Sequence, residues 1–136
     1  MKILQLVARI IAAIIMLQTL YFKFTAQPES VYIFTTLGIE PFGRIGSGIA
    51  ELIASALLLI KPTSWMGAIL GIGVMAGAIV SHLTILGIEV QNDGGQLFFM
   101  ALITFLCCVI VLFYERAKVL RLLSTIFKNN QFFISK

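Results

Sequence analysis

PFGRIGSGIAELIASALLLI, residues 41–60, is the stretch that decides the fold of this chain. The segment is long and apolar enough to cross a bilayer, yet Glu51 stands near its middle. A carboxyl group at that depth costs roughly 2.5–3.5 kcal/mol if it faces lipid, so we expect it to face another helix or a wet cavity. One face of the helical wheel collects the polar and small residues: Arg44, Gly48, Glu51, Ser55 and Leu58. This face predicts a helix that forms the polar spine of a small membrane bundle.

The composition of the chain points to lipid as its main solvent. Of 136 residues, 60% are hydrophobic and only 12% are charged, against about 25% charged in an ordinary soluble domain. The net charge of +4 comes from basic residues at the ends of apolar segments and in the C-terminal segment. Such charges are typical of a membrane surface, so we expect a lipid bilayer as partner and no nucleic acid.

Four apolar segments are long enough to span, and they predict an all-α integral membrane four-helix bundle over residues 1–114. Arg9 interrupts the apolar region of the first segment and no convincing cleavage site follows, so we expect a retained helix and not a signal peptide. The predicted spans are residues 3–24, 42–60, 65–86 and 96–114.

Two further segments are predicted to lie at the membrane surfaces. In the connection 25–41, the Pro28–Glu29 start and the Gly38 stop predict a short interfacial helix that covers the mouth of the bundle; a free loop is the alternative. Residues 115–136 alternate apolar and basic side chains at helical spacing. They predict a basic amphipathic extension lying on an anionic leaflet, that is, a cytoplasmic tail.

The distribution of charge also predicts the orientation of the bundle. With four spans, both termini and the 61–64 turn share one side, and the other connections carry acidic residues. The positive-inside rule therefore places both termini in the cytoplasm, and in a bacterial source the membrane would be the plasma (inner) membrane. The shared side holds Lys2, Lys61, Arg116, Lys118, Arg121, Lys128 and Lys136, and the opposite connections hold Glu29, Glu40, Glu89 and Asp93.

The depth of the polar residues predicts an outward-opening pocket walled by all four spans. At 1.5 Å per residue, Glu51 lies deeper than the other candidates, which fall within about two turns of the outer surface. Each candidate also has a structural alternative: Glu51 as partner of a nearby arginine or lysine, and His82 as a packing residue whose ordinary pKa suits proton transfer. The candidates for ligand binding or proton relay are Lys23, Arg44, Glu51, His82 and Gln96.

Small residues on the third span predict close helix packing on two sides. One side carries Gly67 and Gly71, and the other carries Gly73, Gly77 and Ser81. Cys107 and Cys108 are adjacent in an apolar run, and neighbouring helix positions point about 100° apart, which favours packing over a disulfide. A single histidine without a second nitrogen or thiolate ligand nearby predicts no metal site.

The chain resembles the DoxX family of small membrane proteins over residues 4–114. The likeness rests on LQTLYFKF (17–24), GRIGSGIAELIASALLLI (43–60) and WMGAILGIGVMAGAIVSHL (65–83), followed by a fourth apolar span. The resemblance implies a four-helix membrane bundle, and it links the chain to membrane redox complexes, since the family takes its name from a subunit of a thiosulfate:quinone oxidoreductase. By position, Lys23, Glu51 and His82 match the family's intramembrane polar pattern. The chain lacks a spaced cysteine pair, which argues against thiol-based activity.

These observations favour a DoxX-like accessory or binding subunit of a quinone-linked membrane redox system, without catalysis of its own. Quinone would be its ligand, and no intrinsic cofactor is expected. One alternative is an assembly or scaffolding factor for another membrane protein, in which the polar stripe only fixes the order of the helices. A second alternative is an oligomeric small-solute carrier, although the chain shows neither broken helices nor inverted repeats. Association with another membrane protein or with itself is expected in each case.

Overall fold

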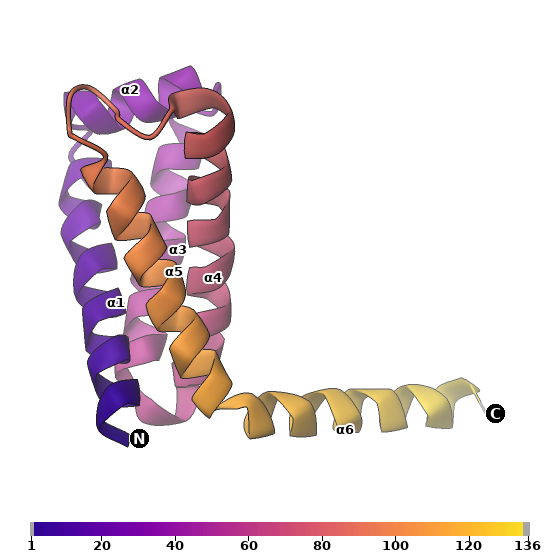
Figure 1. Cartoon of the computed structure of the whole chain (residues 1–136). Helices are drawn as coiled ribbons and strands as arrows, with labels where there is room; N and C mark the ends of the chain where they lie inside the picture. Colours follow the sequence, from indigo (N-terminus) through magenta and orange to yellow (C-terminus); the bar gives the residue numbers. More distant parts are fainter. Residues whose placement is uncertain (1, 135–136) are drawn as a thin grey trace.

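The computed structural model describes residues 2–134, and these form six α-helices without a strand (Figure 1). Two of the six lie outside the bundle: α2 (Pro28–Thr36) crosses one end, and α6 (Arg116–Ile134) leaves the other end sideways. A 3₁₀ turn, η1 (Lys61–Thr63), and a π-helical turn, η2 (His82–Leu86), flank the third long helix. The four long helices are α1 (Lys2–Phe24), α3 (Phe42–Leu59), α4 (Ser64–Ser81) and α5 (Gln96–Tyr114). The predicted all-α four-helix architecture is confirmed.

The four long segments have the length and composition of membrane spans. The apolar side chains on the outer face of α3 are exposed: Ile45, Ile49 and Leu52 keep 42%, 47% and 45% of their surface accessible. Contiguous apolar surface of this extent is rare on soluble monomers. The bundle is therefore built to be surrounded by lipid. The spanning segments are Ile3–Phe24, Phe42–Leu59, Lys61–Leu86 and Gln96–Tyr114.

The bundle packs as a closed ring in which α1 and α4 each contact both α3 and α5. Lipid is as apolar as leucine, so helices in a membrane gain little by burying large apolar side chains and associate through close contact of small ones. The core follows this rule, because small residues from all four helices are fully buried in it: Ala12, Ala54, Ala68 and Cys108.

Two buried arginines fix the register of the antiparallel helices α1 and α3. Near the start of α1, the Arg9 side chain donates from Nε to the Leu58 carbonyl oxygen at 2.6 Å and from its terminal nitrogen to the Leu59 carbonyl oxygen at 2.9 Å. Near the start of α3, Arg44 in turn donates to the Lys23 carbonyl oxygen at the end of α1. The last carbonyls of a helix have no partner within it, so each arginine caps the neighbouring helix. Arg9 is thereby committed to α3 backbone and does not pair with Glu51.

The segment 25–41 contains the predicted short helix, α2, and not a free loop. Pro28 occupies its first turn, where a missing N–H is harmless, and Glu29 lies in the same turn near the positive end of the helix. Gly38 follows at φ +77°, a conformation that suits glycine and ends the helix. Two residues of α2, Ser30 and Phe34, are buried, so this helix packs over one end of the bundle.

The connection between α4 and α5 is organised by Asp93. Its Oδ1 accepts hydrogen bonds from the backbone N–H groups of Val90 at 3.0 Å and Gly95 at 2.8 Å, and its Oδ2 accepts one from Leu97 at 3.2 Å. Burial raises the pKa of this carboxyl, but the three backbone donors favour the charged form and hold its pKa below the ordinary 3.8. The carboxylate therefore anchors the loop and the first turn of α5.

Acid is expected to release this loop. Because the pKa of Asp93 is lower in the folded chain, its contribution to stability is complete above pH 3.8 and is lost as the pH falls through the folded value. We expect hydrogen exchange at the amides of Val90, Gly95 and Leu97 to accelerate below that pH, after correction for the intrinsic exchange rate. The Asp93→Asn variant keeps an acceptor but does not titrate, so its exchange should show no such pH step.

Candidate functional site

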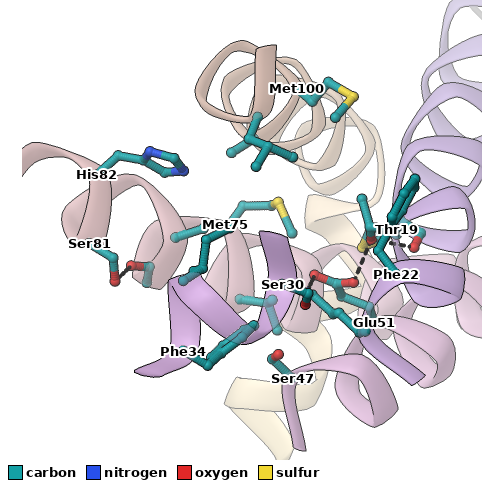
Figure 2. Close-up of a pocket in the computed structure, with 18 of the residues that line it drawn as sticks. Thr19, Phe22, Ser30, Phe34, Ser47, Glu51, Met75, Ser81, His82 and Met100 are labelled. Carbon is teal, nitrogen blue, oxygen red and sulfur yellow. Dashed lines mark hydrogen bonds and ion pairs between the residues drawn. The ribbon is translucent and has the colours of Figure 1, made fainter. Parts of the chain in front are cut away.

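A cavity of about 610 Å³ lies inside the bundle at the end covered by α2. All four long helices line it, together with α2 and η2, and most of its wall is apolar. Volumes of 300–1,000 Å³ with a few convergent polar groups are typical of small-molecule sites. Figure 2 shows Glu51 and His82 on opposite sides of this cavity, with Met75 between them. The cavity is therefore the candidate functional site.

Glu51 forms one polar wall of the cavity with two residues of α1. Its Oε1 lies 2.5 Å from the Lys23 ammonium nitrogen, and its Oε2 lies 2.9 Å from the Thr19 hydroxyl, which also lies 2.8 Å from the Met16 carbonyl oxygen. Glu51 is only 3% exposed and the Lys23 side chain 15%. Among the alternatives that the sequence leaves open for Glu51, the structure selects the pair with Lys23. The ammonium group also lies 5.8 Å from the centre of the Phe34 ring of α2, so the pair contacts the covering helix.

His82 forms the opposite polar wall, at the point where regular α-helix ends. The helix predicted over 65–86 is α-helical only to Ser81 and continues as the π-helical turn η2, a feature frequently found at functional sites. His82 is 5% exposed; its Nδ1 lies 2.9 Å from the Gly87 carbonyl oxygen, and its ring packs edge-on against Phe98. A carbonyl oxygen only accepts, so Nδ1 carries a proton, and when the ring is neutral its Nε2 is an acceptor. No hydrogen bond to Nε2 is found among the described residues.

Two glutamines also belong to the polar lining, as do Glu29, Ser30, Ser47 and Ser81. Gln96, the first residue of α5, lines the cavity as the sequence predicted. Gln18 of α1 lies on another face of its helix than Thr19 and Lys23, yet it also lines the cavity and donates to the Met100 sulfur at 3.0 Å. Gln18 was not among the predicted candidates, because a residue on the side of a helix reaches a cavity only where the neighbouring helix does not pack against that side. Phe34 of α2 also lines the cavity, and it belongs to the short helix that the sequence predicted to cover the mouth of the bundle.

Arg44 is the one predicted binding candidate that does not line the cavity. Its Nε lies 2.8 Å from Glu40 Oε1, and its terminal nitrogen is committed to the Lys23 carbonyl oxygen. The guanidinium thus holds the end of α1 to the start of α3 behind the Glu51–Lys23 pair. Arg44 is buried outside the cavity lining, and its Nε and one terminal nitrogen already have protein acceptors, so the cavity gives no support to Arg44 as a ligand-binding residue.

The five small residues predicted to pack helices divide into two groups. Gly67 packs against backbone atoms of Ala54 and Leu58 in α3, and Gly71 packs against the sulfur of Cys108 in α5, so this side contacts both neighbours of α4. On the other side, Gly73 and Gly77 have no atom of this chain within 4 Å of an added Cβ, so they pack against no helix of the described residues. Both glycines line the cavity, as does Ser81.

Within residues 2–134 no three His, Cys, Asp or Glu side chains gather closely enough to hold a metal ion. The two cysteines are reduced and buried in the packed part of the bundle, away from the cavity lining. The ionisable groups of the lining are therefore the ammonium of Lys23, the carboxylates of Glu29 and Glu51 and the imidazole of His82, beside two amides and several hydroxyl groups. This set can hydrogen-bond, neutralise charge and exchange protons.

The family model described as DoxX matches residues 4–84. This match covers more than half of the chain and includes Lys23, Glu51 and His82. The chain belongs to the DoxX family. In this DoxX-family chain the matched region supplies α1 to α4 and most of the cavity wall, whereas α5 and α6 lie beyond it. No curated protein and no solved structure matched the chain.

Proposed function

We propose that this DoxX-family protein binds the head of a quinone as a non-catalytic accessory subunit of a membrane redox system. The observation that carries the proposal is the cavity itself: about 610 Å³, mostly apolar, with hydrogen-bonding groups at two opposite sides. A quinone head needs flat apolar contact and one polar partner for each of its two oxygens. A ligand that is confined to the membrane also suits a cavity lined by membrane helices.

The two polar walls differ in what they offer such a ligand. The Lys23 ammonium has three N–H donors and uses one for Glu51, so it can donate to a carbonyl oxygen. On the other side, the His82 ring in its neutral form presents Nε2 as an acceptor and suits a hydroxyl group. The Lys23 side thus favours a carbonyl oxygen, as in an oxidised quinone, and the His82 side favours a hydroxyl group, as in a reduced quinol. Glu51 neutralises Lys23, so binding requires no net charge on the ligand.

We infer that the α2 end of the bundle faces away from the cytoplasm, and in a bacterial source the membrane would be the plasma membrane. The basic residues near that end are both paired, Lys23 with Glu51 and Arg44 with Glu40. The other end carries the basic residues of η1 and α6, and the positive-inside rule places such an end in the cytoplasm. Under this orientation α2 lies at the outer interface, with the half-exposed Tyr32 near the headgroups. Labelling a Ser124→Cys variant, with the new thiol in α6, by an impermeant thiol reagent from each side of sealed vesicles tests this orientation.

The binding of ubiquinone-1 to the full chain in nanodiscs tests the proposal. We expect His82→Phe and Gly77→Leu each to weaken binding at least tenfold, or about 1.4 kcal/mol. The first variant removes the acceptor while keeping an aromatic ring, and the second fills space that the ligand would occupy. Gly46→Leu is the matched control, since Gly46 also has open space around it but lies outside the cavity. Equal affinity in all four proteins would refute quinone binding at this site.

Mass spectrometry of the protein purified gently from its native membrane separates the accessory role from scaffolding. Recovery of a redox subunit or a quinone supports the accessory role, and recovery of an unrelated membrane protein without a cofactor supports scaffolding. The glycines sharpen this distinction. Because Gly73 and Gly77 line the cavity, bulky residues there should remove the ligand and leave a protein partner bound.

A further inference from the structure

The helix α6 is a long element with almost no contact to the rest of the chain. It runs for 19 residues, Arg116–Ile134, and the described side chains from Leu120 onward are all exposed. It carries four basic residues and no acidic one: Arg116, Lys118, Arg121 and Lys128. A helix of this length exposed on all sides is not stabilised by the bundle, so its apolar side chains need another environment.

The side chains of α6 divide into two opposite faces. At 100° per residue, Leu123 and Ile126 fall on one side of the helix, whereas Arg121, Thr125 and Lys128 fall on the other. The apolar face is exposed: Leu123 keeps 44% of its surface and Ile126 47%. The apolar face comprises Val119, Leu122, Leu123, Ile126 and Phe127. A basic face opposite a broad apolar one is the pattern of helices that lie in a membrane interface.

The corner between α5 and α6 sets the direction of the helix. Glu115 is 8% exposed and joins three elements: its Oε1 accepts from the Gln5 side chain of α1 at 2.6 Å, and its Oε2 lies 3.0 Å from Lys118 Nζ of α6. Beside it, the Arg116 guanidinium lies 4.2 Å from the centre of the Phe113 ring and donates to the Phe113 carbonyl oxygen at 2.9 Å. These contacts hold the turn at the end of the span.

Figure 1 shows the result: α6 runs crosswise to the four long helices from the end that holds the N-terminus. The long helices have the composition of spans, so a helix crosswise to them at their end follows the plane of the membrane surface. Its starting point, directly after the span that ends at Tyr114, lies at the level of the headgroups.

We propose that α6 is a surface anchor that binds anionic lipid headgroups, with its apolar face in the acyl boundary and its basic face toward the phosphates. The partner follows from three observations: the exposed apolar face, the basic residues of α6 beyond the Lys118–Glu115 pair, and the direction set by the corner between α5 and α6. The role is independent of the cavity at the other end of the bundle. An anionic surface attracts each basic residue within a Debye length, and the apolar face adds the attachment that charge alone lacks.

Spin labels on the full chain test the anchor. A label is placed on the apolar face (Ile126→Cys) or on the polar face (Thr125→Cys) in a Cys107→Ala, Cys108→Ala background. The protein is reconstituted in nanodiscs of phosphatidylcholine alone or mixed with phosphatidylglycerol. In the anionic mixture we expect the label at 126 to collide with lipid-soluble oxygen and the label at 125 with an aqueous nickel chelate. Equal accessibility at the two positions in the anionic mixture would overturn the proposal.

Charge variants test the choice of anionic lipid. Each basic residue near an anionic surface contributes about a fivefold preference, so Arg121→Gln with Lys128→Gln should lower the ratio of surface-bound to free α6 by roughly 25-fold. The same variants should have little effect in phosphatidylcholine alone. Dipolar coupling between labels at 126 on two chains would show instead that a second copy covers the apolar face, and would refute the lipid anchor.

Discussion

Replacing Lys23 by methionine is expected to lower the free energy of unfolding by about 3–5 kcal/mol, the cost of leaving a buried charge without its partner. The Glu51 carboxylate is 3% exposed, and its ion pair with Lys23 is held between α1 and α3. Methionine keeps the length of the lysine stem, so the change removes the charge with little change in packing. Unfolding of the full chain by a denaturing detergent in mixed micelles measures the loss.

A double variant separates the lost pair from other effects of the lysine. Lys23→Met combined with Glu51→Gln leaves no unpaired charge, and an amide keeps an acceptor for the Thr19 hydroxyl. We therefore expect the double variant to recover most of the stability. Lys61→Met, at an exposed lysine of η1, controls for the loss of one positive charge and should change stability by less than about 1 kcal/mol. If the double variant is as unstable as Lys23→Met, the pair is not the cause.

The inward face of each polar helix could be predicted from the sequence alone. The stripe from Arg44 to Leu58 is buried in the structure, whereas Ile45 and Ile49 on the other faces are exposed. The prediction succeeds because a polar residue in a span is favourable only when it faces the interior of the bundle, and residues three or four positions away lie on the same face of the helix. The same reasoning applies to α1, where Arg9 is buried together with Ala12 and Met16, which lie three and seven positions further along the helix.

The partners of those residues could not be predicted. Arg9 and Arg44 bind backbone carbonyl oxygens at the ends of neighbouring helices, and every residue type carries such an oxygen. The spacing of side chains therefore gives no sign of these bonds. The surroundings of Gly77 could not be predicted for a related reason. A glycine permits close approach but does not require it, and only the folded chain shows that this side of α4 lines a cavity.

Gly67→Ala is the second change with a large expected effect, and it acts on the packing of α3 against α4. An added Cβ would lie 2.7 Å from the Ala54 carbonyl oxygen and 2.7 Å from the Leu58 nitrogen. Both atoms belong to backbone, so no side chain can rotate away and the two helices must separate. We expect a loss of about 1–3 kcal/mol, the usual cost of overpacking. Separation would also strain the bond from Arg9 to the Leu58 carbonyl oxygen, which spreads the damage to α1.

Two other glycines of the bundle provide the controls for Gly67. Gly46 has no atom within 4 Å of an added Cβ, so Gly46→Ala should stabilise the chain by about 0.5–1 kcal/mol through helix propensity. At Gly71 the close atom is the side-chain sulfur of Cys108, at 2.7 Å. Cys108→Ala should therefore relieve Gly71→Ala, whereas trimming Leu57, the side chain nearest Gly67, should leave Gly67→Ala unstable because its closest neighbours are backbone. Detergent unfolding of these variants decides whether backbone contact or side-chain bulk limits the approach of α4 to its neighbours.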